Sequence, residues 1–350
     1  MTTTADAPAT TRPQGRVVAR AWGPRLVVLV GAVAVLAVAV LGSLMIGRQT
    51  LAPSTVLAEL WRDGGGMAAD IVRGLRMDRT VISLAVGLSL GAAGALMQAL
   101  TRNPLADPGL LGINAGAALA VVTSISYLGL TAPGQYVWVA FVGAAITALL
   151  VYGVASVGRE GATPVRLALV GAALTATATS AITMMLLTDR TALGLYRFWS
   201  VGSLVNRDLD LAATIGPFVA VGAVLALGSA RFLDAMALGE DLAHGLGARV
   251  AQGRVVVLAA VVLLCGGATA LVGPIAFVGL MVPHLARRLV GQDHRWVLPY
   301  AAALGAVLLL AADVIGRLLV PDELEAGLVV AVLGAPVLIA IVRGSKAVSM

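Results

Sequence analysis

Ten apolar segments, most of them long enough to cross a membrane, follow one another along this chain of 350 residues. The hydrocarbon core of a bilayer is about 30 Å thick, and a helix needs about 20 residues to cross it. The segments cover residues 26–46, 80–100, 110–130, 137–157, 165–187, 211–227, 255–272, 275–289, 297–320 and 324–342. With 59% hydrophobic and 12% charged residues, the sequence predicts an all-α polytopic membrane protein with about ten transmembrane helices.

The polar ends of the chain predict how it is organised around these segments. Residues 1–25 are rich in Thr, Ala and Pro and have no apolar period, so we expect a disordered cytoplasmic tail. Residues 26–342 are predicted to form a single transmembrane domain, and residues 343–350 a second cytoplasmic tail. Basic residues are most frequent in the tails and loops that this orientation places inside, which favours cytoplasmic termini at both ends.

The basic residues also limit the functions open to the chain. Among the 24 basic residues Lys346 is the single lysine, and it lacks the GxxxxGK(S/T) pattern of a phosphate-binding loop. We therefore expect no nucleotide and no other cofactor on this chain. The net charge of +6 is spread over loops between the apolar segments rather than over one soluble patch, so no nucleic-acid partner is expected.

The sequence offers little for catalysis or metal binding. The apolar segments contain no Ser-His, paired-acid or HExxH arrangement, so we expect no enzymatic activity. His284 has no second ligand at metal-like spacing, and we predict no metal site. His244 and His294 lie in predicted loops, where solvated side chains are expected.

The longest polar interruption in the second half of the chain is residues 231–254, with the sequence RFLDAMALGEDLAHGLGARVAQGR. Its middle predicts a short helix of about three turns that is closed by Gly245 and Gly247. Composition alone leaves two interpretations open. The segment is either a spacer between two membrane helices or a docking site for a partner outside the membrane.

Residues 102–112 read RNPLADPGLLG, which closely resembles the signature of the FecCD-type permeases. These are the membrane subunits of type II ATP-binding-cassette importers for ferric siderophores, haem and cobalamin. Similar stretches follow in the same order over nearly all of the chain: LGEDLAHGLG, GPIAFVGLMVPHLARRLVGQDHRWVLP, LLAADVIGRLL and ELEAGLVVAVLGAPVLI. The resemblance implies a permease subunit in a bacterial plasma membrane that carries a ferric siderophore or related iron chelate into the cytoplasm. Haem and cobalamin are the alternative cargoes.

The resemblance also implies the partners of the chain. Two separate ATPase subunits would bind ATP and Mg²⁺ and power transport, and an extracytoplasmic substrate-binding protein would deliver the cargo. A second copy of the permease, or a similar permease, would complete the pore as a homodimer or heterodimer. The remaining partner is the lipid bilayer.

Three sets of residues match functional positions of the family. The ATPase-coupling set is Leu238, Gly239, Glu240, Ala243, Leu246 and Gly247, within what we call the coupling segment, residues 231–254. The binding-protein docking set is Arg76, Arg79 and Arg317, and the cytoplasmic gate set is Asn103, Leu105 and Thr163. Arginine suits docking because its planar fork can hold a carboxylate by two hydrogen bonds; anchoring to lipid headgroups is the alternative role. Asp78 stands where the family usually has proline.

Asp313 is an acid inside the ninth apolar segment. A charge at the bilayer centre costs roughly 2.5–3.5 kcal/mol on insertion scales. The carboxyl group is therefore expected to be neutral, to face water, or to pair with a neighbour such as Arg317 one turn along the helix. If it carries function, the alternative class of protein is an ion-coupled secondary transporter with Asp313 at its centre.

Gly87, Gly91 and Gly94 form a run of small residues on the second apolar segment. Such spacing lets two helices approach closely. Two interpretations follow, tight packing within one bundle and a dedicated seam between two copies.

Overall fold

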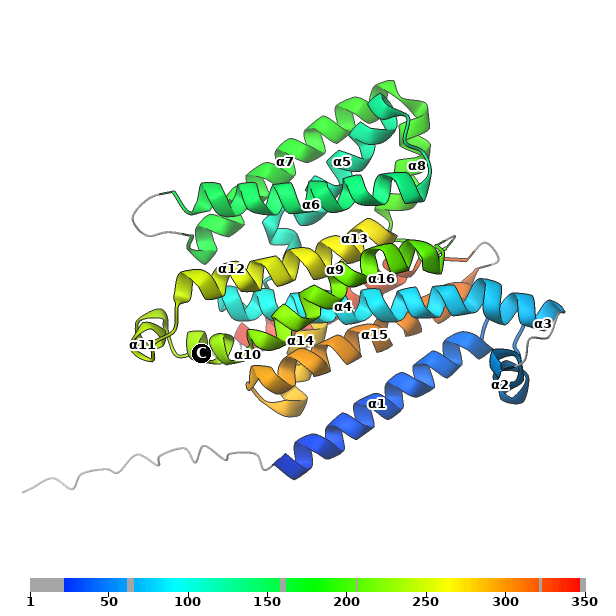
Figure 1. Ribbon diagram of the computed structural model, residues 1–350, viewed down its shortest axis with the longest axis horizontal. Coiled ribbons are helices and arrows are strands. Elements are labelled where there is room, and N and C mark those ends of the chain that lie inside the picture. Colours follow the sequence, from blue (N-terminus) through cyan, green and yellow to red (C-terminus); the bar gives the residue numbers. More distant parts are fainter. Residues whose placement is uncertain (1–21, 62–65, 158–161, 206, 321–322, 347–350) are drawn as a thin grey trace, which may run out of the picture.

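A computed structural model describes residues 22–61, 66–157, 162–205, 207–320 and 323–346, and all regular secondary structure in these ranges is helical (Figure 1). Residues 1–21 of the predicted N-terminal tail and the last four residues lie outside the described ranges. The helix α1 begins at Trp22, four residues before the predicted start of the first apolar segment.

Each of the ten predicted segments coincides with a helix. The helices that form these segments are α1 (Trp22–Met45), α4 (Met77–Thr101), α5 (Ile113–Leu128), α6 (Pro133–Ala155), α7 (Pro164–Thr188), α9 (Leu209–Gly228), α12 (Val250–Val261) with the six-residue α13 (Gly267–Val272), α14 (Val278–Val290), α15 (His294–Leu319) and α16 (Ala326–Lys346). Shorter elements are α2 (Pro53–Trp61), α3 (Met67–Ala69), α8 (Arg190–Ser200), α10 (Ala230–Ala237) and α11 (Glu240–Gly245), with the π-helical turns η1 (Asp70–Arg76) and η3 (Val262–Gly266) and the 3₁₀ turn η2 (Pro108–Leu111).

Seven helices in the described part of the chain are long and apolar enough to cross a membrane. They span Leu26–Met45, Met67–Thr101, Pro133–Ala155, Pro164–Thr188, Leu209–Gly228, Val250–Val272 and His294–Leu319. The predicted third and tenth segments form shorter apolar helices, Ile113–Leu128 and Ala326–Ala340. The predicted eighth segment, residues 275–289, becomes helical only at Val278, where α14 begins. Residues 273–277 lie between α13 and α14 and belong to neither helix.

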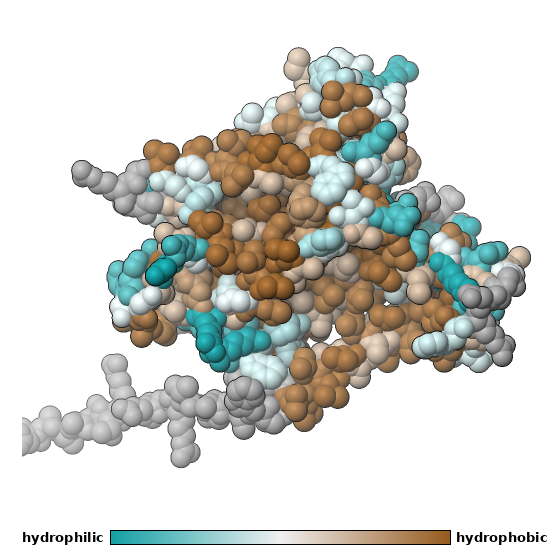
Figure 2. All heavy atoms as spheres, viewed as in Figure 1, coloured by the Kyte–Doolittle hydropathy of each residue, from teal (hydrophilic) through white to brown (hydrophobic). Residues whose placement is uncertain are grey.

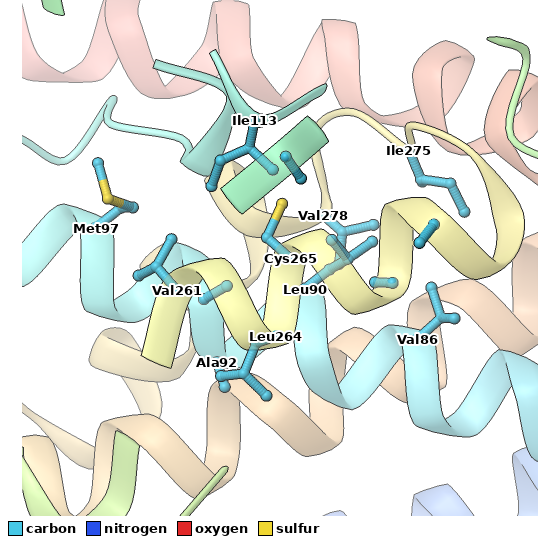
Figure 3. Packing of buried hydrophobic residues seen from close by; sticks show 14 of the residues in the cluster. Val86, Leu90, Ala92, Met97, Ile113, Val261, Leu264, Cys265, Ile275 and Val278 are labelled. Atoms are coloured by element: carbon cyan, nitrogen blue, oxygen red, sulfur yellow. The ribbon is translucent and has the colours of Figure 1, made fainter. Parts of the chain in front are cut away.

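The helices lie roughly side by side, in two groups joined by a middle layer (Figure 1). Helices α5, α6 and α7 pack on one another at one side, and α1, α4, α14 and α15 pack together at the other. Between the two groups, α9 contacts α4 and α12, and α13 contacts α6. Helix α4 is central. In the most apolar stretch of Met67–Thr101, which includes α4, 78% of the residues are buried, against 6% in that of α1. Figure 3 shows Val86, Leu90 and Met97 of α4 in this core.

Glycines bring α4 into direct backbone contact with its neighbours. A Cβ atom on Gly91 would lie 2.1 Å from the carbonyl oxygen of Ala301 in α15, and one on Gly94 would lie 2.0 Å from that of Gly279 in α14. Real Cβ atoms do not approach other atoms so closely, so any side chain at these positions would push the helices apart. These glycines therefore serve packing within one bundle, as the first interpretation predicts.

Helix α14 contains a proline whose missing N–H is compensated from α4. Pro283 cannot donate to the carbonyl oxygen of Gly279, four residues earlier. The buried amide of Gln98 supplies that donor, because its Nε2 lies 3.2 Å from the oxygen of Gly279 and 3.0 Å from that of Leu280. Arg287 donates in turn to Oε1 of Gln98. The side chain of Gln98 thus joins α4 to α14 and completes the backbone hydrogen bonding there.

We predict that Gly94→Ala destabilises the bundle by about 1–3 kcal/mol, because the new methyl group overlaps the backbone of α14. Thermal unfolding of the purified protein in mild detergent measures the change. Gly153→Ala is the matched control, since a Cβ atom there meets no atom within 4 Å. Equal unfolding temperatures for the two variants would contradict the close packing of α4 on α14.

Candidate functional site

The coupling segment folds as two short helices rather than as one helix of three turns. Helix α10 ends at Ala237, and α11 covers only the six residues Glu240–Gly245. Between them Gly239 has a φ of 115°, a backbone conformation that favours glycine, and Gly247 with a φ of 83° ends the turn after α11. The prediction of a single helix is wrong because Gly239 breaks it in the middle. The predicted closure at Gly245 and Gly247 is confirmed.

Three leucines of the coupling segment are exposed. Leu242 lies within α11, Leu238 precedes it and Leu246 follows it, and 61%, 61% and 68% of the surfaces of Leu238, Leu242 and Leu246 are exposed. We call these three residues the leucine face. Leu238 and Leu246 are among the predicted coupling residues, whereas Leu242 is missing from that set. Exposed apolar side chains gathered on one polar loop favour contact with another molecule.

The inner side of the coupling segment holds α11 in place. Ala243 is fully buried and packs with Met236 and Val250, which belong to α10 and α12. Nη2 of Arg254 in α12 donates to Oε2 of Glu240 in α11, at 2.7 Å. The predicted residue Ala243 therefore supports the surface from below, and Glu240 ties α11 to α12.

A cluster of charged residues lies at the opposite end of the bundle, where α15 meets α4. The carboxylate of Asp313 is fully buried, and its Oδ1 accepts a hydrogen bond from Nε of Arg79 at 2.7 Å. Its other oxygen pairs with Arg317. Of the interpretations for Asp313, pairing with Arg317 is therefore confirmed. Two guanidinium groups that share one carboxylate offset the cost of burying it.

Glu323 extends this cluster at the end of α15. Its Oε2 lies 2.5 Å from Nη1 of Arg79, and its backbone adopts a left-handed conformation with a φ of 56°. Such a conformation is unfavourable for a glutamate and is held in place by its surroundings. We call Arg76, Arg79, Asp313, Arg317 and Glu323 the arginine cluster.

Two arginines of the cluster satisfy the carbonyl groups at the end of α1. Arg76 donates to the oxygens of Leu44 and Met45 at 2.8 and 2.9 Å, and Arg317 donates to that of Ser43 at 2.8 Å. The last carbonyls of a helix have no partner within the helix, and positive charge is favourable there. Arg76 and Arg317 are only 6% and 5% exposed. The structure therefore gives both an internal role, and docking of a binding protein on them stays a prediction.

The arginine cluster borders a polar depression of about 910 Å³. Among its other lining residues are Arg48, Asp78, Arg207, Asp208 and Glu325. Nη2 of Arg79 and Nε of Arg317 are buried donors that lack a hydrogen-bond partner within the described part of the chain. The predicted docking arginines thus lie together, beside a cavity that is lined by charges of both signs.

The predicted gate residues follow the end of α4 and precede the start of α7, and these two helix ends lie at the same side of the bundle as α11 (Figure 1). Asn103 accepts a hydrogen bond from the backbone N–H of Leu105 at 2.9 Å, which fixes the turn after α4. Nearby, burial raises the pKa of the Asp107 carboxyl, which caps η2. Thr163 caps the start of α7. These contacts explain the turns, and a gating role stays a prediction.

The two histidines that the sequence places in loops differ in their surroundings. His244 is exposed on α11, as expected for a solvated side chain. The expectation is wrong for His294, which is buried with its ring nitrogen Nδ1 2.7 Å from Oδ1 of Asp234 in α10. The described residues include no group of three or more His, Cys, Asp or Glu side chains placed to hold a metal ion.

Comparison with known proteins identifies the family. A model described as the FecCD transport family matches residues 35–344. The chain belongs to this family. It is 44% identical to the ferric enterobactin transport system permease FepD of Escherichia coli K12 over 91% of this chain and 96% of that one. It is 36% identical to the hemin transport system permease HmuU of Yersinia pestis, over 85% and 87%.

A solved structure has the same fold. It is a metal-chelate type ABC transporter in an inward-facing conformation, with a TM-score of 0.79 and 24% identity over 91% of this chain and 99% of that one. This member of the FecCD family is a multi-pass permease of the bacterial plasma membrane, and its family membership makes it a transport subunit rather than an enzyme.

We predict that Asp313→Asn destabilises this FecCD permease by about 3–5 kcal/mol, because Arg79 and Arg317 then keep buried charges without their shared carboxylate. Chemical unfolding in detergent measures the loss. Asp210→Asn, at an exposed site in the first turn of α9, is the control and should change stability little. An Asp313→Asn variant as stable as wild type would show that the cluster is not held together by charge.

Proposed function

We propose that this permease carries a ferric siderophore or related iron chelate into the cytoplasm, as one half of a pore that is driven by separate ATPase subunits. The cargo follows from its relatives, which are described as permeases for ferric enterobactin, Fe(3+)-citrate and hemin. All three names describe iron held by a chelator. Hemin makes haem the second candidate cargo, and none of these names refers to cobalamin.

The leucine face is the observation that carries the proposal. It lies on and beside the short helix α11, which projects from the bundle between α10 and α12 and is held by the pair of Glu240 with Arg254 (Figure 1). Apolar side chains presented on a rigid helix fit a cleft in a partner protein and can transmit a push. Because the chain lacks a phosphate-binding loop of its own, we assign ATP and Mg²⁺ to two ATPase subunits that dock here.

The two ends of the bundle support an orientation for the permease. Figure 2 shows polar residues mostly at the ends of the bundle, with a broad apolar surface between them. We place the coupling segment in the cytoplasm, in line with the distribution of basic residues. The polar depression beside the arginine cluster then faces outward, and we assign docking of a substrate-binding protein through its carboxylates to the arginines that line this depression.

The exposed side of α7 is where we place the passage for the chelate, between this chain and a second permease. Thr177, Thr179, Ser180 and Thr183 are exposed, and each hydroxyl donates to a carbonyl oxygen one turn earlier at 2.8 to 2.9 Å. The exposed side of α7 also carries the large apolar side chains Leu169, Met184 and Leu187, so small hydroxyl groups and apolar surface lie together on it. A second copy, or a similar permease, placed against α7 would enclose a passage wide enough for a chelate.

The surroundings of Asp313 argue against an ion-coupled secondary transporter. Such carriers use acids that can exchange protons or ions near the middle of the membrane. The side chain of Asp313 is buried and accepts hydrogen bonds from both Arg79 and Arg317, so it is closed off by two fixed partners. We therefore assign Asp313 a structural role.

The leucine face can be tested by copurification. We expect an ATPase subunit to copurify with the tagged permease from its native cells in mild detergent. Leu242→Ala with Leu246→Ala should lower its recovery at least tenfold, because each truncation removes about 1.5–3 kcal/mol of apolar contact. Glu240→Arg should do the same by breaking the pair with Arg254 and placing two positive charges together.

The control for this test is Leu128→Ala, which removes an equally exposed leucine at the far end of α5. It should leave recovery of the ATPase unchanged. If no ATPase accompanies the wild-type chain, or if the double variant retains it fully, the coupling segment is not the docking site and the proposed mechanism fails.

A further inference from the structure

Asp234 and His294 join the coupling segment to the longest single α-helix of the bundle. Asp234 lies in α10, and His294 is the first residue of α15, 60 positions later in the chain. One oxygen, Oδ1 of Asp234, lies 2.7 Å from Nδ1 of His294 and 2.9 Å from its backbone nitrogen. An ionised carboxylate can only accept hydrogen bonds, so both nitrogens donate to it.

The backbone hydrogen bond makes Asp234 a cap for α15. The first N–H groups of a helix have no partner within the helix, and a negative charge is favourable beside them. Asp293 precedes the helix and accepts from the backbone of Arg295 at 3.1 Å. Asp234 accepts from His294, so the first turn of α15 is completed by a residue of α10.

Packing around this contact holds it in place. The side chain of His294 is 7% exposed and that of Asp234 is 34% exposed, and beside Asp234 the residues Leu233 and Met236 are buried. Helix α10 also packs on α15, α4 and α9. Two hydrogen bonds to one carboxylate oxygen therefore connect α10 to the start of α15, and we expect a displacement of α10 to move the start of α15 with it.

Helix α15 leads from this contact to the arginine cluster. It covers 26 residues, which corresponds to a length of about 39 Å. Along this length it packs on α4, α1, α14 and α16. Near its far end it carries Asp313 and Arg317, and Figure 1 shows it running from the side of α10 toward the side of α2.

We infer that Asp234 and His294 form a joint through which the coupling segment moves α15 and, with it, the arginine cluster at the other end of the bundle. The inference rests on the proposed function, since an ATPase on the leucine face must supply the displacement. Neither residue touches the cargo; both are positioning residues, and the joint links ATP hydrolysis to a change of shape at the distant end.

The test measures a distance in the assembled complex of permease and ATPase. Spin labels are placed on Leu318→Cys, at the end of α15, and on Leu128→Cys, at the end of α5, in a Cys265→Ala background. Both leucines are exposed, and Cys265 is the only native cysteine. Pulsed electron spin resonance gives the distance between them without nucleotide and with ATP and vanadate.

We expect nucleotide to shift this distance in the otherwise wild-type complex, and His294→Ala to abolish the shift while the bound ATPase still hydrolyses ATP. His294→Asn should restore the shift, because the amide nitrogen of asparagine can take the place of Nδ1. If His294 served stability alone, His294→Ala would lower the stability of the complex, and ATP hydrolysis and the distance shift would be kept or lost together. A full shift in His294→Ala, or no recovery in His294→Asn, would overturn the joint.

If His294→Ala does not assemble with the ATPase, the same distance measurement on Asp234→Leu tests the joint independently. This change removes both hydrogen bonds at similar volume, so the shift should again be lost, and a retained shift would overturn the joint. Failure of the proposed function looks different. In that case no ATPase binds the wild-type chain, or nucleotide shifts no distance even with Asp234 and His294 intact.

Discussion

The direct backbone contact between α4 and its neighbours is the constraint on which the rest of this permease depends. Gly91 and Gly94 leave no room for a side chain against α15 and α14, and α4 is the most deeply buried of the membrane helices. This contact holds α15 against α4. The two ends of α15 in turn carry the features that matter for function, His294 beside the coupling segment and Asp313 in the arginine cluster.

An apolar bundle must satisfy its own polar groups, and here it does so with long side chains from other helices. Gln98 supplies the donor that Pro283 lacks, Arg76 and Arg317 bind the last carbonyls of α1, and Asp234 caps α15. In each case a polar group at a helix end or break is satisfied by a residue distant in sequence. The same contacts hold the helices in register, so residues that resemble functional ones also serve the fold.

Much of the fold could be predicted from the sequence, because a membrane helix is encoded locally by about 20 apolar residues. The pairing of Asp313 with Arg317 was equally accessible, since the two are four residues apart on one helix. The contacts of Asp313 with Arg79 and of Asp234 with His294 could not be predicted in this way. The first joins residues that are 234 positions apart in the sequence, and the second joins residues that are 60 positions apart. Loop histidines look solvated in sequence, and only the packing of α10 on α15 buries His294.

Cysteine labelling tests most directly whether the leucine face lies in the cytoplasm and is covered by an ATPase. In a Cys265→Ala background, a membrane-impermeant maleimide is added to cells that carry Leu242→Cys or Leu128→Cys. We predict that Leu128→Cys reacts in intact cells, whereas Leu242→Cys reacts only after the membrane is opened and is protected when the ATPase is coexpressed. Reaction of Leu242→Cys in intact cells, or equal labelling with and without the ATPase, would contradict it.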